Sequence, residues 1–197
     1  GKYQLTMLHH SSFAPLSRSM GPMLKEEAFH LFTGQSGLSR IVKAGKVPIE
    51  ILQKYLNKWL STGYDLLGKD RSGSAARFYR WGFKGRFDEV TAKEPPKDLE
   101  LLNEEARQLY YKEDCEIIES FNKLIPAGKP KLRAPDIKFN REIGDYAGKR
   151  YSVTGEALSE SEYAEHLKKV LPGSEDRRIL EPIFKAGNWT TADAKAA

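Results

Sequence analysis

The sequence is poor in the residues that build disulfides and soft-metal sites. It has a single cysteine, Cys115, in 197 residues, which excludes an internal disulfide and a cysteine-rich zinc module. Only four histidines are present, so a histidine site must be small or take ligands from elsewhere. No stretch approaches the ~18 uninterrupted apolar residues of a membrane-spanning helix, so we expect no membrane partner. The low cysteine content is typical of the reducing cytoplasm, the location that we expect.

Positive charge exceeds negative charge only slightly. The chain has 32 Lys and Arg against 27 Asp and Glu, a net charge of +5. This excess is a weak indication of anionic partners and is no nucleic-acid signature by itself. With 40% hydrophobic and 30% charged residues, a packed core can form and wholesale disorder is excluded. The length fits one large domain, or one domain with a tail.

The chain opens in the middle of a pattern. Its first residue is Gly1, and no charged-then-apolar leader follows it. Residues 3–10 have a helical pattern but no capping residue before them. We therefore expect the chain to be the C-terminal piece of a longer protein.

Helical periodicity dominates the first 125 residues. The spacing of apolar residues predicts five helices, over residues 3–10, 15–34, 48–67, 74–90 and 99–124. Gly34 is expected to end the second helix in a left-handed conformation and residues 35–47 to form a connection. Pro22 must either kink the second helix or mark its true start.

Beyond residue 125 the pattern becomes less regular. Residues 149–157 alternate like a short hairpin. Ser159 and Glu162 form a capping box that opens a helix to residue 171, and Ser174 is expected to cap a last helix. The tail over 190–197 should be loose. The sequence thus predicts a mainly α protein, with a helical bundle portion over 1–125 and an irregular extension over 126–197 that holds two short helices.

One face of the second predicted helix carries a carboxylate and an imidazole. The stripe steps by four, three, four and three residues, which keeps it on one face: Leu16, Met20, Met23, Glu27 and His30. Its first three members are apolar, so we expect this face to look inward, where an unpaired carboxylate is unfavourable. Glu27 and His30 can both reach one metal ion, and Glu-x-x-His pairs on inward-facing helices build di-iron centres. The sequence therefore predicts Glu27 and His30 as metal ligands.

Two simpler interpretations compete with a metal site. Glu-x-x-His occurs by chance as a solvated pair in many helices, and a buried Glu–His hydrogen bond can serve packing alone. A metal site also needs a facing helix. With a turn near Phe13, the position level with Glu27 on an antiparallel helix lies about 14 residues before Phe13, at or just upstream of Gly1. We therefore expect the partner ligand to lie outside the chain.

Seven segments spread over most of the chain carry a more specific signal. They are 1–5 (GKYQL), 13–16 (FAPL), 23–30 (MLKEEAFH), 37–40 (GLSR), 55–57 (YLN), 82–86 (GFKGR) and 139–144 (FNREIG). Together they resemble the last ligand-bearing part of the benzoyl-CoA epoxidases. These are oxygenase components of aerobic aromatic degradation, in the phenylacetyl-CoA epoxidase-like group.

The resemblance implies the C-terminal portion of a ferritin-like bundle. In that family two iron ions are held by carboxylates and histidines from four helices. Glu27 and His30 match the motif of the fourth helix, and the acid of the third helix would fall just before Gly1. The chain would then carry only part of the metal centre.

The activity that the resemblance implies is oxygen activation. With O2 as co-substrate, one oxygen atom would add across an aromatic double bond of an aryl-CoA thioester such as benzoyl-CoA. Electrons would come from NADPH through a separate flavin and iron–sulfur reductase. Neither nucleic acid nor membrane is an expected partner.

A helical module that binds an anionic ligand or nucleic acid without metal is the alternative. Arg77, Arg80 and Lys84 are spaced to form a basic face beside several aromatic residues. We favour a solvated cationic face opposite core aromatics. A family member that lost its metal and survives as a scaffold is a third hypothesis.

Asp114 is the strongest rival acid in the chain. It aligns with Tyr110, Ile117 and Phe121 on an apolar face of the last long helix. A buried aspartate with satisfied hydrogen bonds is the simpler interpretation, and a metal ligand is the other.

Overall fold

The computed structural model describes residues 1–191, and this part of the chain is helical without β-strands. The prediction of a mainly α protein is therefore confirmed. None of the helices in this range is both long and apolar enough to cross a membrane. The elements are α1 (Lys2–His9), α2 (Ala14–Ala44), α3 (Ile49–Asp65), α4 (Gly73–Arg80), the 3-10 helix η1 (Leu99–Leu101), α5 (Leu102–Asn122), α6 (Glu160–Val170) and α7 (Ser174–Lys185).

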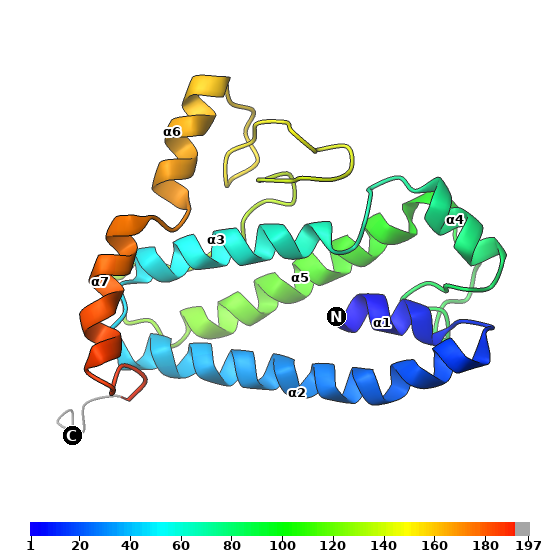
Figure 1. The fold of residues 1–197 in the computed structure, drawn as a ribbon, viewed down its shortest axis with the longest axis horizontal. Helices are drawn as coiled ribbons and strands as arrows, with labels where there is room; N and C mark the ends of the chain where they lie inside the picture. Colours follow the sequence, from blue (N-terminus) through cyan, green and yellow to red (C-terminus); the bar gives the residue numbers. More distant parts are fainter. Residues whose placement is uncertain (192–197) are drawn as a thin grey trace.

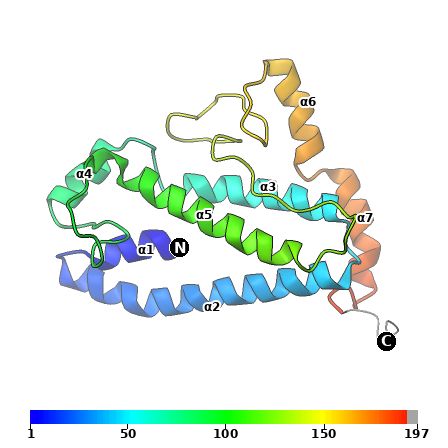
Figure 2. The ribbon, with the colours of Figure 1, turned by 180° about the vertical axis from the view of Figure 1, so that it is seen from behind.

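Three long helices, α2, α3 and α5, form the body of the molecule (Figure 1). The short α1 folds back along the first half of α2, while α6 and α7 lie at the opposite end (Figures 1 and 2). One core cluster joins the three long helices through Val42, Ile118 and Phe121, with partly buried leucines of α3 packed against it. A second cluster joins α1 to α5 through Tyr3, Met7 and Ala106. The bundle arrangement follows from these two apolar clusters.

Helix α2 is longer than the sequence predicted. We expected it to end at Gly34, but it continues to Ala44, and Gly45 supplies the left-handed stop with φ 65°. A glycine inside a helix costs only about 1 kcal/mol relative to alanine. Burial of Val42 and the packing of Leu38 against the core outweigh that cost. Pro22 lies within the helix and does not mark its start.

Helix α4 is shorter than predicted. The expected helix over 74–90 ends at Arg80, and Gly82 follows with φ 71°. The loop then returns to the turn between α1 and α2, because Gly85 donates its N–H to the carbonyl of Met7 at 2.9 Å. Ser12 likewise donates to the carbonyl of Gly82 at 2.6 Å. The GFKGR segment is therefore an anchored loop.

The C-terminal part matches the local signals of the sequence. An isolated antiparallel bridge joins Tyr151 to Ala157, which confirms the hairpin-like turn. The capping box of Ser159 and Glu162 starts α6 as predicted. The N-cap of α7 is Gly173, and Ser174 is the first helical residue, so the predicted cap is wrong by one position. Of the tail that we expected to be loose, residues 192–197 lie outside the described range.

A buried arginine cluster ties the irregular segment to the long helices. It consists of Arg107, Arg141, Asp65, Asp70 and Glu104. Both guanidinium groups are fully buried, and Asp70 accepts from both, at 2.5 Å from Arg107 and 3.4 Å from Arg141. Glu104 also pairs with Arg107, and Asp65 pairs with Arg141. The FNREIG segment thus supplies a structural anchor.

Candidate metal site

Glu27 and His30 lie side by side near the middle of α2. Glu27 Oε2 is 3.7 Å from His30 Nδ1, and Glu27 Oε1 is 3.5 Å from the amino nitrogen of Gly1. The Glu27 side chain is 33% exposed and that of His30 is 67% exposed. The carboxylate and the imidazole can therefore approach the same ligand from one helix face.

The hairpin of α1 and α2 brings the first residue of the chain to this carboxylate. At the turn, the Ser17 hydroxyl donates to the carbonyl of His9 at 2.6 Å and fixes the two helices against each other. Figure 1 shows α1 running back along α2 and ending at the N-terminus beside the middle of α2. The sequence prediction that Gly1 and Glu27 lie at one level is confirmed by their contact.

The expected inward orientation of the stripe is wrong at two of its members. Met20 is buried, but Met23 is 45% exposed and His30 is largely exposed. For His30 the reason is that α1 reaches only as far as Glu27, whereas Met23 lies within the stretch alongside α1 and is exposed nonetheless. Farther along α2, Phe29 and Phe32 are each 66% exposed. These two phenylalanines lie on the side of α2 away from Glu27, so their exposure concerns a different face from the stripe.

Glu27 and His30 line a groove of about 380 Å³ between α2, α3 and α5. The other polar side chains that line it are Gln35, Tyr110 and Asp114. A mostly apolar groove with a few polar groups is typical of a small-molecule site. Its apolar lining consists of Leu31, Leu38, Leu56, Leu60, Ile117, Ile118 and Phe121.

Asp114, the rival acid, lies in the same groove. It is only 8% exposed, and its Oδ2 has no hydrogen-bond partner among the described residues. Burial raises the pKa of Asp114 to about 7, and the nearby Glu113 carboxylate adds to that effect, whereas a hydrogen bond from Tyr110 opposes it. Asp114 is thus buried, as the simpler interpretation expected, but its hydrogen bonding is satisfied only in part among the described residues.

Two side chains of the groove have the donor atoms that an iron site needs. Carboxylate oxygen and imidazole nitrogen are donors that suit iron, so the donor chemistry of Glu27 and His30 fits. However, no group of three or more His, Cys, Asp or Glu side chains within residues 1–191 is placed to hold a metal ion. Asp114 therefore does not complete a ligand set with Glu27 and His30.

The three basic residues of the alternative hypothesis do not form one face. Arg77 and Arg80 are exposed on α4, but Lys84 lies beyond the end of that helix. Its Nζ donates to Asn103 Oδ1 at 2.7 Å, and burial lowers the pKa of Lys84 to about 8. The predicted basic face is wrong because α4 ends before Lys84.

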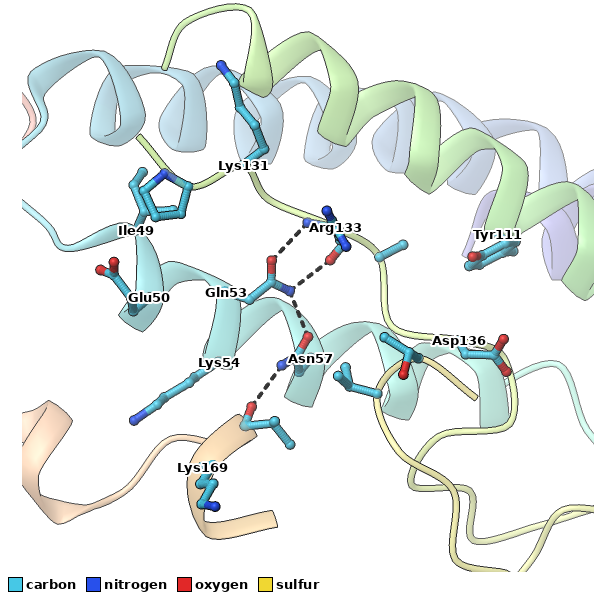
Figure 3. A pocket seen from close by; sticks show the side chains of 15 residues that line it. Ile49, Glu50, Gln53, Lys54, Asn57, Tyr111, Lys131, Arg133, Asp136 and Lys169 are labelled. Atoms are coloured by element: carbon cyan, nitrogen blue, oxygen red, sulfur yellow. Dashed lines mark hydrogen bonds between the residues drawn. The ribbon is translucent and has the colours of Figure 1, made fainter. Parts of the chain in front are cut away.

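A second cavity of about 500 Å³ lies between α3, the segment over 130–136 and the end of α6, and no residue lines both it and the groove. Figure 3 shows Gln53 between Asn57 and the backbone of Arg133. Gln53 accepts from the Arg133 N–H at 2.8 Å and donates to Asn57 Oδ1 at 2.7 Å. Lys54, which also lines the cavity, pairs with Asp176. The Gln53 contacts fix the extended segment on α3, and the Lys54 pair joins α7 to α3.

Sequence reasoning found the polar members of the groove but not the groove itself. Glu27, His30 and Asp114 each stood out from helical periodicity. The groove forms from three helices that are far apart in sequence, and one of them, α2, was expected to end before Leu38. The continued apolar spacing after Gly34 was the signal that could have revealed it.

Comparison with known proteins supports the resemblance. No family model matches the chain. Benzoyl-CoA oxygenase component B of Aromatoleum evansii is 32% identical over an alignment 247 positions long, which covers 99% of this chain and 52% of that protein. The chain therefore spans about half the length of the curated relative that it matches. The similarity inferred from the seven segments is confirmed.

Proposed function

We propose that this chain, a relative of benzoyl-CoA oxygenase component B, forms part of a di-iron monooxygenase that epoxidises the aromatic ring of an aryl-CoA thioester. The observation that carries the proposal is the Glu27–His30 pair on the wall of a mostly apolar groove. A nucleic-acid-binding module is the weaker hypothesis, because its basic face does not form.

In this proposal Glu27 and His30 hold iron through a carboxylate oxygen and an imidazole nitrogen. Bound iron would supply the activation of O2, which the side chains of this chain cannot perform by themselves. The apolar side chains of the groove would pack against the aromatic ring and exclude water from it. A separate flavin and iron–sulfur reductase would deliver the electrons from NADPH, in the cytoplasm.

We infer that the other iron ligands precede Gly1 in the natural protein. Gly1 lies against the Glu27 carboxylate, so a residue placed just before it would start beside that carboxylate. The chain also spans about half of its relative. Finally, Phe29 and Phe32 are each 66% exposed on the side of α2 away from Glu27, where further helices of a bundle would bury them.

Iron content of point variants tests the proposal. In the protein as naturally encoded, Glu27→Gln and His30→Ala are each expected to lose most of the bound iron, measured by elemental analysis of the purified protein. Without iron, their unfolding midpoints should stay close to that of the iron-free wild type, because both side chains are partly exposed.

The matched control is Glu26→Gln, an exposed carboxylate next to Glu27 on the same helix. It should keep the iron of the wild type. Wild-type iron in both the Glu27 and the His30 variants would contradict the proposal. A natural protein that binds no iron at all would favour the scaffold hypothesis.

A further inference from the structure

Asp114 differs from the other buried acids of the described chain in having no cation beside it. The buried acids are Asp70, Asp114 and Asp176. Asp70 pairs with two arginines and Asp176 with Lys54 at 2.8 Å. No ion pair is formed by Asp114 within the described residues, and its Oδ2 lacks any hydrogen-bond partner there. An uncompensated carboxylate in such a place favours its neutral, protonated form.

Within residues 1–191, no lysine or arginine lies close enough to the Asp114 carboxyl to shift its pKa. Tyr110 and Glu113 face it from its own helix, Tyr64 from α3 and Tyr3 from α1. The titratable groups that share the groove from α2 are Glu27 and His30. All of these neighbours are phenols, carboxylates or a partly exposed imidazole.

Gly63 of α3 makes room for the Tyr110 hydroxyl beside this acid. A Cβ atom at position 63 would come within 2.7 Å of the Tyr110 hydroxyl oxygen. The hydroxyl donates a hydrogen bond to the Asp114 carboxyl. Tyr110 and Asp114 both line the groove, so the acid, its phenol partner and the Glu27–His30 pair border one cavity.

We propose that Asp114 is a proton donor to the groove, which delivers a proton to the oxygen chemistry that we assign to the iron site of Glu27 and His30. This role rests on the proposed function. When one atom of O2 enters an organic substrate and the other leaves as water, two electrons and two protons are consumed. The electrons come from the reductase. The O–H bond of Asp114 breaks, its proton goes to the oxygen atom that leaves as water, and solvent supplies the second proton and then reprotonates the carboxylate.

The donor role differs from that of an iron ligand. Because the described residues hold no group of three metal-ligating side chains, Asp114 stands apart from the Glu27–His30 pair. Replacing it should therefore leave iron binding intact and impair proton delivery. Loss of one general acid typically lowers a rate by about a hundredfold or more.

The test uses Asp114→Asn in the naturally encoded protein. We expect normal iron content, a kcat for an aryl-CoA substrate lowered by about a hundredfold and a KM changed much less. Infrared spectroscopy should show a protonated carboxylic acid band in the wild type at pH 6 that titrates near pH 7 and is absent from the variant. Asp114→Glu should restore part of the turnover, and Glu116→Gln, an exposed acid on α5, should change none of these readouts.

Different outcomes separate this inference from the proposed function. An iron-loaded Asp114→Asn protein with unchanged turnover would overturn the donor role alone, as would the absence of the carboxylic acid band at pH 6. Loss of iron in this variant would identify Asp114 as a ligand and overturn the donor role. A wild-type protein that binds no iron would instead overturn the proposed function, and the donor role with it.

Discussion

The buried arginine cluster and the groove that holds Asp114 are both polar regions in an apolar interior, but they are organised in opposite ways. In the cluster, Arg107 and Arg141 are fully buried, and both contact Asp70. In the groove, Asp114 has no cation and one carboxylate oxygen without a partner among residues 1–191. The first region uses charge to hold segments together, whereas the second leaves a polar group available to a ligand.

Removing a cation from the arginine cluster should give the largest change in stability. Arg107→Met leaves Asp70 and Glu104 without their main partner, and breaking a buried ion pair costs about 3–5 kcal/mol. Urea unfolding followed by circular dichroism measures the loss. The control is Arg178→Met, because Arg178 and its partner Glu175 are both exposed. A loss in Arg107→Met no greater than in this control would contradict the structural role of the cluster.

The acid in the groove should give a smaller, pH-dependent change. The pKa of Asp114 is raised from 3.8 to about 7 by burial, so the folded protein retains a proton that the unfolded chain releases. Stability therefore falls as pH rises from about 4 to about 7 and is level above that range. Asp114→Asn lacks the proton uptake of the carboxyl, so its stability relative to the wild type should improve by about 3–4 kcal/mol between pH 4 and pH 8.

The difference between the unfolding free energies of variant and wild type removes most of the contribution of groups that titrate in both proteins, such as Glu27 and His30. Urea midpoints at pH 4, 6 and 8 give the comparison. A stability difference between variant and wild type that stays constant over this range would show that Asp114 is ionised at neutral pH.

Replacing a glycine of left-handed backbone conformation in the FNREIG segment should lower stability by a somewhat smaller amount. Gly144 has φ 82°, and a Cβ atom there would clash with the Asp70 carboxylate. Gly144→Ala should cost about 1–3 kcal/mol. Gly148→Ala is the matched control, because Gly148 has φ 70° and nothing lies within 4 Å of its Cβ position. Equal losses in the two variants would mean that the contact with Asp70 adds nothing to the backbone strain.

The Glu27–His30 pair should contribute least to stability. Its members are 33% and 67% exposed, and a pair of this kind is worth less than about 1 kcal/mol. Thermal unfolding of Glu27→Gln without iron should therefore match that of the iron-free wild type. A large loss of stability would assign the pair to packing, the simpler interpretation considered from the sequence.

Local signals predicted much of this structure, because they depend on near neighbours in the chain. Helix geometry predicted the capping box at Ser159. Together with the position of the turn, it also predicted that Gly1 lies beside Glu27. Local signals did not predict that α2 continues beyond Gly34. It continues because tertiary packing of Leu38 and Val42 outweighs the helix-breaking tendency of glycine.

In the candidate site, too, local sequence predicted single residues, whereas tertiary packing decided how they come together. Periodicity identified Glu27, His30 and Asp114, but it could not show that one groove joins them, since that depends on how α2 and α5 meet. Periodicity also predicted that His30 is buried. His30 is exposed because α1 reaches only as far as Glu27.

X-ray diffraction at the iron absorption edge, on crystals of the iron-loaded natural protein, tests the metal assignment most directly. We predict an anomalous difference peak within coordination distance of both the Glu27 carboxylate and the His30 imidazole. A peak elsewhere in an iron-loaded crystal, with these two side chains contacting only water or each other, would contradict it.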